Sequence, residues 1–353
     1  MNETKEKRIV ALDCIRFFAI LCVVLTHVTE SIYTLNIDFL CSAERIVRVS
    51  GIMFFTIGRL GVPLFFFLTG YLMLDRTYTS EDIVKLWKRN VLGMFVATEV
   101  WICIYYLFSM WINHLSFSGE LLIRQMLFLK NASCPHLWYM PVILGLYIFI
   151  PFVSNAINKC DRKIVCYPLI FVVLYLFVPP ILNVFCYIFG KEPLYKIVDF
   201  SFSGKEYGVL LMIGWMIKQG FFLRMKNYFH IILFGGGYIS TVVLELYAYK
   251  NGVEYNVWYD SLTLLIASFS MFNLCLNIKE VKIDALLGWL SRMAFAVYLC
   301  HDIVIVLLSK YLVITNYVTK TCIVFGGGLV ISFCIVRVIC FSKRISRVLF
   351  FVK

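Results

Sequence analysis

Repeated apolar runs, each about 18–24 residues long, constrain the fold of this chain more than any other feature of its sequence. A helix of about 20 apolar residues crosses a bilayer core and satisfies its backbone hydrogen bonds internally. The chain is 61% hydrophobic and 15% charged, whereas soluble domains are about 45–50% apolar. We therefore predict an all-α, polytopic membrane protein with about ten transmembrane helices. The predicted helices cover residues 9–32, 50–74, 91–113, 137–155, 164–186, 204–220, 228–248, 258–277, 286–308 and 320–341.

The basic residues predict the orientation of these helices. The formal net charge is +12, but Lys and Arg lie in short loops between apolar runs, which indicates topology signals and not a nucleic-acid surface. The segment before the first helix carries Lys5, Lys7 and Arg8. Loops assigned to the cytoplasm hold about twice as many basic residues as the outer loops, so we expect both termini in the cytoplasm. The expected protein is a multi-pass component of the plasma or inner cell membrane, with residues 1–353 forming a single transmembrane domain and no appended soluble domain.

The chain has 13 cysteines, most of them within apolar runs, and this pattern favours free buried thiols. A disulfide between Cys41 and Cys134 is the alternative. The sequence contains no Cys-x-x-Cys pair, no metal-type His/Cys spacing, no phosphate-binding glycine loop and no Gly-x-Ser-x-Gly. We therefore expect neither a metal nor a nucleotide-binding domain.

The first predicted helix carries an arginine and a histidine inside an apolar segment. Arg16 and His27 are 11 residues apart, so they point off one helix face about 16 Å apart along the axis. Ionisable groups in hydrocarbon cost several kcal/mol and usually have a function. Asp13 can pair with Arg16, and Glu30 can orient His27 as a general base. Arg16 fits an anion clamp for a phosphate-bearing donor, and a structural ion pair with Asp13 is the alternative.

The second and third predicted helices contain further charged groups. Arg59 needs a partner within the membrane, and Glu99 is the candidate. Gly61 and Gly70 allow close helix approach. Arg89 belongs to a basic cluster before the third helix, which indicates a topology signal or a contact to donor phosphates.

Two later segments add polar side chains to apolar runs. His136 and Trp138 open the fourth helix, where they fit either an interfacial aromatic belt or an acceptor pocket. His301 and Asp302 lie deep in the ninth predicted helix, which indicates a polar network there. Neighbours in sequence lie on different faces of a helix, so we expect no direct pair between these two.

Five segments, in order, are similar to motifs of the membrane acyltransferase-3 family. They are Leu12-Asp13-x-x-Arg16-x-x-Ala19 with His27 after a ten-residue gap, Gly61-Val-Pro-Leu-Phe-Phe-Phe-Leu-Thr-Gly-Tyr71, Lys88-Arg89, His136-Leu-Trp-Tyr and Ala296-Val-Tyr-Leu-Cys-His301. The chain departs from the family in Thr69, where Ser is usual, and in lacking a proline after Arg89.

This resemblance implies transfer of an acyl group, most often acetyl, from acetyl-CoA or another acyl-CoA. The implied acceptor is a hydroxyl group of a surface polysaccharide or a lipid-linked glycan, and the remaining partners are membrane lipids, not nucleic acid. It also implies that His27 and Arg16 form the essential pair and that Arg89 contacts the donor. His27 acts as a general base or accepts the acyl group itself. The alternative function is an exporter of sugar or polysaccharide intermediates, with Arg16, Arg59 and His27 lining the route.

Overall fold

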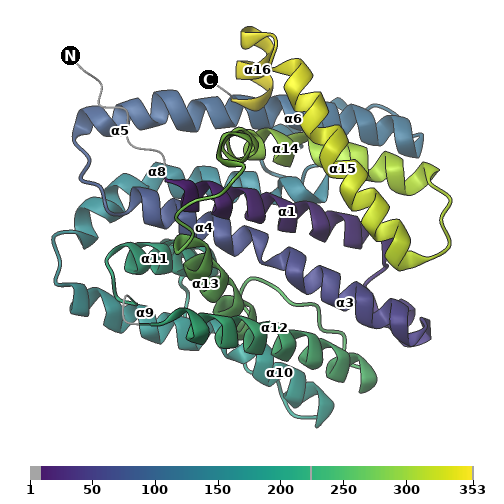
Figure 1. The fold of residues 1–353 in the computed structure, drawn as a ribbon, viewed down its shortest axis with the longest axis horizontal. Helices are drawn as coiled ribbons and strands as arrows, with labels where there is room; N and C mark the ends of the chain where they lie inside the picture. Colours follow the sequence, from purple (N-terminus) through teal and green to yellow (C-terminus); the bar gives the residue numbers. More distant parts are fainter. Residues whose placement is uncertain (1–8, 223–224, 352–353) are drawn as a thin grey trace.

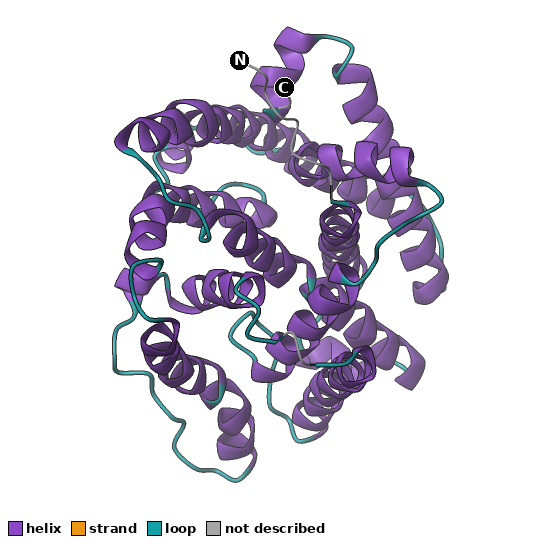
Figure 2. Ribbon diagram, turned by 60° about the vertical axis from the view of Figure 1, so that its left-hand side comes forward, coloured by secondary structure: helices purple, strands orange, loops and turns teal. Residues whose placement is uncertain are grey.

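The computed structural model describes residues 9–222 and 225–351, and these residues form helices and connecting loops without any strand (Figures 1 and 2). The longer helices are α1 (Val10–Ile32), α3 (Arg45–Arg59), α4 (Gly61–Met73), α6 (Leu92–Asn113), α8 (Tyr139–Ile157), α9 (Arg162–Phe177), α11 (Lys205–Lys218), α12 (Asn227–Lys250), α13 (Leu262–Leu276), α14 (Asp284–Tyr311) and α15 (Tyr317–Ile339). The short elements are α2 (Ile37–Ser42), α5 (Ser80–Leu86), the π-helical turn η1 (Trp87–Val91), α7 (Gly119–Met126), the 3₁₀ turn η2 (Pro135–Trp138), α10 (Pro179–Ile188), the 3₁₀ turn η3 (Ser201–Ser203) and α16 (Lys343–Phe350).

All ten predicted segments are helical, and eight helical spans among the described residues are long and apolar enough to cross a membrane. The all-α, polytopic membrane class is therefore confirmed. The other two segments, 204–220 and 258–277, correspond to α11 and α13, which have 14 and 15 residues. At 1.5 Å per residue each covers about 20 Å, less than a hydrocarbon core of about 30 Å. Helix α11 packs against α4, and α13 packs against the longer α12.

Helix α1 lies at the centre of the bundle (Figure 1) and packs against α3, α4, α13, α14 and α15. Ile15, Ala19, Ile20, Val24 and Val28 of α1 are all fully buried. An α1 that is enclosed by protein in this way can carry polar side chains that do not face lipid.

The second predicted span is divided into α3 and α4 at Leu60. Pro63 has no backbone N–H and cannot donate to the carbonyl group of Arg59, so the helix is interrupted there. The division leaves Arg59 in the last turn of α3.

Two glycines allow α4 to approach its neighbours closely, as the sequence predicts. A Cβ atom at Gly61 would lie 2.6 Å from the carbonyl oxygen of Ala19 in α1. A Cβ atom at Gly70 would lie 1.9 Å from the carbonyl oxygen of Leu211 in α11. Only glycine permits these backbone contacts.

Several local predictions are corrected or confirmed. The basic cluster before the third span lies in α5 and η1, not in a loop, because the helix runs continuously from Ser80 to Asn113. The fifth span is divided between α9, which ends at Phe177, and α10, which begins at Pro179. The disulfide alternative is wrong: the cysteines are free, and Cys41 is exposed whereas Cys134 is buried. Lys5, Lys7 and Arg8 lie outside the described residues.

Candidate active site

Three histidines from distant parts of the chain meet beside the C-terminal half of α1. The ring of His27 in α1 lies 5.7 Å from the ring of His136 in η2 and 5.3 Å from that of His301 in α14, measured between centroids. The rings of His136 and His301 are 4.9 Å apart. His136 and His301 are buried, while 14% of the His27 side chain is exposed. We call these three residues the histidine cluster.

Contacts of Nδ1 bear on where the rings of His27 and His301 hold their protons. His27 Nδ1 lies 2.9 Å from Oε2 of Glu30, one helical turn along α1, as the sequence predicts. If it donates to that carboxylate, the lone pair of Nε2 is left free to accept a proton. His301 Nδ1 contacts the carbonyl oxygens of Val297 and Tyr298 at 3.1 and 2.7 Å. A carbonyl only accepts, so His301 Nδ1 is the donor and its buried Nε2 holds a lone pair without a partner.

Arg59 is the partner that holds Glu30. Its Nη2 donates to Glu30 Oε1 at 3.2 Å, and its Nη1 donates to the Tyr259 hydroxyl group at 3.0 Å. The guanidinium group also lies over the rings of Phe55 and Trp258, at 4.4 and 4.6 Å from their centroids. The predicted Arg59–Glu99 pair is therefore wrong, because the nearer carboxylate of Glu30 takes its place.

Glu99 and Arg89 do not join the histidine cluster. Glu99 lies in α6, where its Oε1 is buried and has no hydrogen-bond partner within residues 9–222 and 225–351. Arg89 is exposed in the π-helical turn η1. Single π-helical turns within helices are frequent at functional sites, but no hydrogen bond or ion pair connects Arg89 with His27 among the described residues.

Trp138 packs inside the protein among other aromatic rings. Its ring lies 5.6 Å from each of the rings of Tyr207, Trp258 and Tyr259. Because Trp258 and Tyr259 also hold Arg59, these rings connect Trp138 to the Arg59–Glu30–His27 chain. Trp138 is therefore half-buried against rings of the same protein.

Arg16 occupies the other end of the same helix. Its Nη1 lies 3.3 Å from Asp13 Oδ1, so the predicted ion pair is present, and Ser291 of α14 donates to the same oxygen at 2.6 Å. About 34% of the Arg16 side chain is exposed. Since His27 also contacts α14, through His301, the Asp13–Arg16 pair and His27 lie on the α14 side of α1.

A second polar cluster adjoins the histidines, and sequence reasoning missed it. Cys134 Sγ lies 2.7 Å from His136 Nδ1 and 2.8 Å from Asp302 Oδ2. Pro135 favours the extended conformation of Cys134 and begins the 3₁₀ turn that carries His136. The signal in the sequence was the run Cys134-Pro135-His136, directly before a predicted span. As predicted, Asp302 and His301 do not pair with each other.

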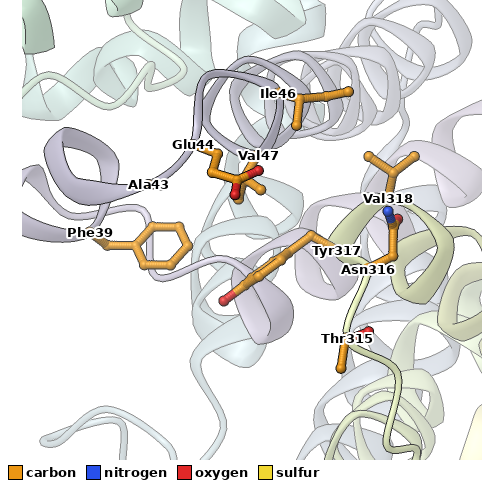
Figure 3. A pocket seen from close by; sticks show the side chains of 9 residues that line it. All are labelled: Phe39, Ala43, Glu44, Ile46, Val47, Thr315, Asn316, Tyr317 and Val318. Carbon is orange, nitrogen blue, oxygen red and sulfur yellow. The ribbon is translucent and has the colours of Figure 1, made fainter.

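A separate pocket lies between α2, α3 and the loop before α15 (Figure 3). Its volume is about 310 Å³, at the lower end of ligand pockets. Figure 3 shows the rings of Phe39 and Tyr317 beside each other, with centroids 5.9 Å apart, and the carboxylate of Glu44 above them. The Tyr317 ring lies 5.5 Å from the ring of Tyr33, the residue that ends α1. The pocket therefore adjoins the same end of α1 as His27.

A bundle of membrane-length helices with histidine, carboxylate and guanidinium groups enclosed near its centre defines a polytopic membrane protein with an internal polar site. A family model described as an acyltransferase domain matches residues 9–337. The match spans nearly the whole chain and includes every residue of the site, so the chain belongs to the acyltransferase-3 family and is an acyltransferase. Comparisons with curated proteins and with solved structures give no match.

Proposed function

We propose that this protein is an O-acyltransferase of the plasma or inner membrane. It moves an acyl group, in the first instance acetyl, from acyl-CoA to a hydroxyl group of a surface polysaccharide or lipid-linked glycan. The observation that carries this proposal is the contact of His27 Nδ1 with Glu30, which leaves Nε2 to accept a proton when Nδ1 donates to the carboxylate. Membership of the acyltransferase-3 family supports acyl transfer over the exporter alternative.

His27 is the proposed general base. Its Nε2 removes the proton from the acceptor hydroxyl group while the hydroxyl oxygen attacks the thioester carbonyl carbon. The new C–O bond forms, the C–S bond of the thioester breaks, and the CoA sulfur takes the proton from His27. Glu30 and Arg59 are positioning residues, because they hold the imidazole ring through Nδ1. An acyl-His27 intermediate is the other route to the same products.

Arg16 is the proposed clamp for the donor. A guanidinium group binds phosphate oxygens in a bidentate manner, and the partial exposure of Arg16 leaves room for a ligand beside Asp13. The distance of about 16 Å from Arg16 to His27 along α1 suits a donor whose charged end and reactive thioester are separated by an extended arm. Arg89, exposed in η1 just before α6, is a second proposed contact to donor phosphates from the cytoplasmic side.

The acceptor is proposed to enter from the opposite end. His136 and His301 line one side of His27, and Trp138 offers an aromatic face of the kind on which sugar rings stack. The pocket of Phe39, Glu44 and Tyr317 combines rings with a carboxylate that can bind hydroxyl groups (Figure 3). We assign an adjoining sugar unit of the glycan to this pocket.

The test uses the purified full-length protein in detergent with acetyl-CoA and glycan fractions from its own cells. We expect CoA release that depends on the glycan, together with a gain of one acetyl group per modified sugar in the mass spectrum. Omitting the glycan is the control for simple hydrolysis. Transport of glycan into vesicles without thioester cleavage would contradict the proposal and favour the exporter.

A further inference from the structure

We propose that Cys134, His136 and Asp302 bind a zinc ion. This inference goes beyond acyl transfer and stands on the geometry of these three side chains. The sequence did not indicate this site, because Asp302 lies far along the chain from Cys134 and His136. The three ligand atoms lie within 4.8 Å of one another, and Cys134 and His136 are buried.

The three ligand atoms lie close enough together for one ion to reach all of them. Cys134 Sγ lies 2.7 Å from His136 Nδ1 and 2.8 Å from Asp302 Oδ2, and the latter two atoms are 4.0 Å apart. In a tetrahedral zinc site, bonds of about 2.0–2.3 Å place such ligand atoms about 3.4–3.6 Å from one another. Binding would therefore move the thiolate outward by somewhat less than about 1 Å and bring the nitrogen and oxygen atoms about 0.5 Å closer together.

The charges of the three groups match a divalent cation. Thiolate and carboxylate supply two negative charges and a neutral imidazole supplies none, so a Zn²⁺ complex is electrically neutral. Neutrality matters here because charges buried without compensation are costly. No lysine or arginine forms an ion pair with Asp302 among the described residues. A metal ion would therefore supply the positive charge that this carboxylate lacks.

The second ring nitrogen of His136 gives an independent indication. Among the described residues, His136 Nε2 is buried and has no hydrogen-bond partner. Zinc at His136 Nδ1 would leave the proton of this ring on Nε2, making it a donor. An acceptor for that proton is the outer contact that usually orients a metal-bound histidine.

The ligand set selects the metal. Sulfur, nitrogen and oxygen together suit zinc, and three protein ligands with an open fourth position are typical of catalytic zinc sites. The His136 ring lies 5.7 Å from the His27 ring, so the ion would lie one side chain away from the proposed base.

The experiment measures metal content in the full-length protein, purified in detergent without a polyhistidine tag. After incubation with Zn²⁺ and gel filtration, we expect about one zinc per chain. Cys134→Ser and Asp302→Asn keep the shapes of the side chains and should lower zinc affinity by more than about 10–100-fold, the effect of losing an outer contact. Cys300 is a different buried cysteine, which lies in α14 next to His301 in the sequence. The Cys300→Ser variant should keep the zinc.

Cobalt adds a spectroscopic readout in the wild-type protein, which needs no variant to detect thiolate coordination. The wild-type protein loaded with Co²⁺ should show a thiolate-to-cobalt charge-transfer band, which Cys134→Ser should lack. Less than about a tenth of an equivalent of zinc in the wild-type protein, no such cobalt band, or unchanged zinc in both ligand variants would overturn the proposal. Since no substrate is used, such a result would leave the proposed acyl transfer untouched.

Discussion

At the scale of single residues, the proposed proton transfer depends on three side chains in contact, Arg59, Glu30 and His27. The His27–Glu30 contact was predictable because residues three apart on a helix are neighbours. The partner of Arg59 was not predictable, because helix periodicity does not say which helices touch. Glu30 and Glu99 were both possible carboxylates, and the packing of α3 against α1 selects Glu30.

Replacing Glu30 by Gln tests the orientation of the base. The amide cannot hold the imidazole ring as strongly or stabilise its protonated form, so the transfer rate should fall about 10–100-fold. The KM for acyl-CoA should change little, because Glu30 lies away from the proposed donor clamp. Steady-state kinetics of CoA release provide the measurement, and Glu280→Gln at an exposed loop is the matched control. An unchanged rate would remove Glu30 from the mechanism.

Arg16 variants separate the donor clamp from the chemistry. Arg16→Ala should raise the KM for acyl-CoA about 10-fold or more, since a charge-assisted hydrogen bond contributes about 1.5–3 kcal/mol. Arg16→Lys retains the charge but not the bidentate geometry, so its KM for acyl-CoA should lie between those of the wild-type protein and Arg16→Ala. Titration of acyl-CoA at saturating acceptor measures the effect, with Arg45→Ala as the control. The clamp is refuted if KM stays constant and only kcat falls.

At the scale of helices, the apolar runs located the elements well and their ends less well. Hydropathy shows which segment is surrounded by lipid or protein. The ends of a helix are set by capping residues and prolines, which hydropathy does not detect. Pro63 divides the second span into α3 and α4, and α11 and α13 are shorter than their apolar segments. The basic residues before the third span were assigned to a loop because they are polar, although α5 and η1 continue the helix there.

The contact between α4 and α11 can be tested with a matched pair of glycines. In Gly70→Ala the new methyl group meets the backbone of Leu211, so the protein should lose about 1–3 kcal/mol of stability. In Gly145→Ala the methyl group meets no atom within 4 Å, and alanine favours a helix by up to about 1 kcal/mol. Thermal unfolding in detergent should therefore show a lower Tm for the first variant only. Equal Tm values would contradict the close approach.

At the scale of the whole molecule, the sequence predicted the class of fold and most members of the site, but not how they assemble. The histidine cluster joins α1, η2 and α14, which are more than a hundred residues apart. Each histidine was a candidate by itself because it interrupts an apolar run. Their meeting, and the contact of Cys134 with Asp302, follow from helix neighbours that periodicity along one chain does not encode.

The orientation in the membrane has a direct test in two native cysteines. Cys41 and Cys160 are both exposed, the first in α2, within the predicted outer loop, and the second after α8 in a predicted cytoplasmic loop. A membrane-impermeant maleimide added to intact cells should label Cys41 and leave Cys160 unlabelled until the membrane is opened. Cys41→Ser and Cys160→Ser identify the two sites. Labelling of Cys160 from outside would reverse the predicted topology.

The central claim is that His27 performs the proton transfer inside the protein. The most direct measurement compares glycan-dependent CoA release by the wild-type protein, His27→Ala and His230→Ala, which removes another buried histidine far from the cluster in sequence. Loss of a general base should lower the rate of His27→Ala by about 10²–10⁴-fold at an unchanged gel-filtration profile. His230→Ala should keep most of the activity. A folded His27→Ala variant that transfers acetyl groups at the wild-type rate would contradict the account.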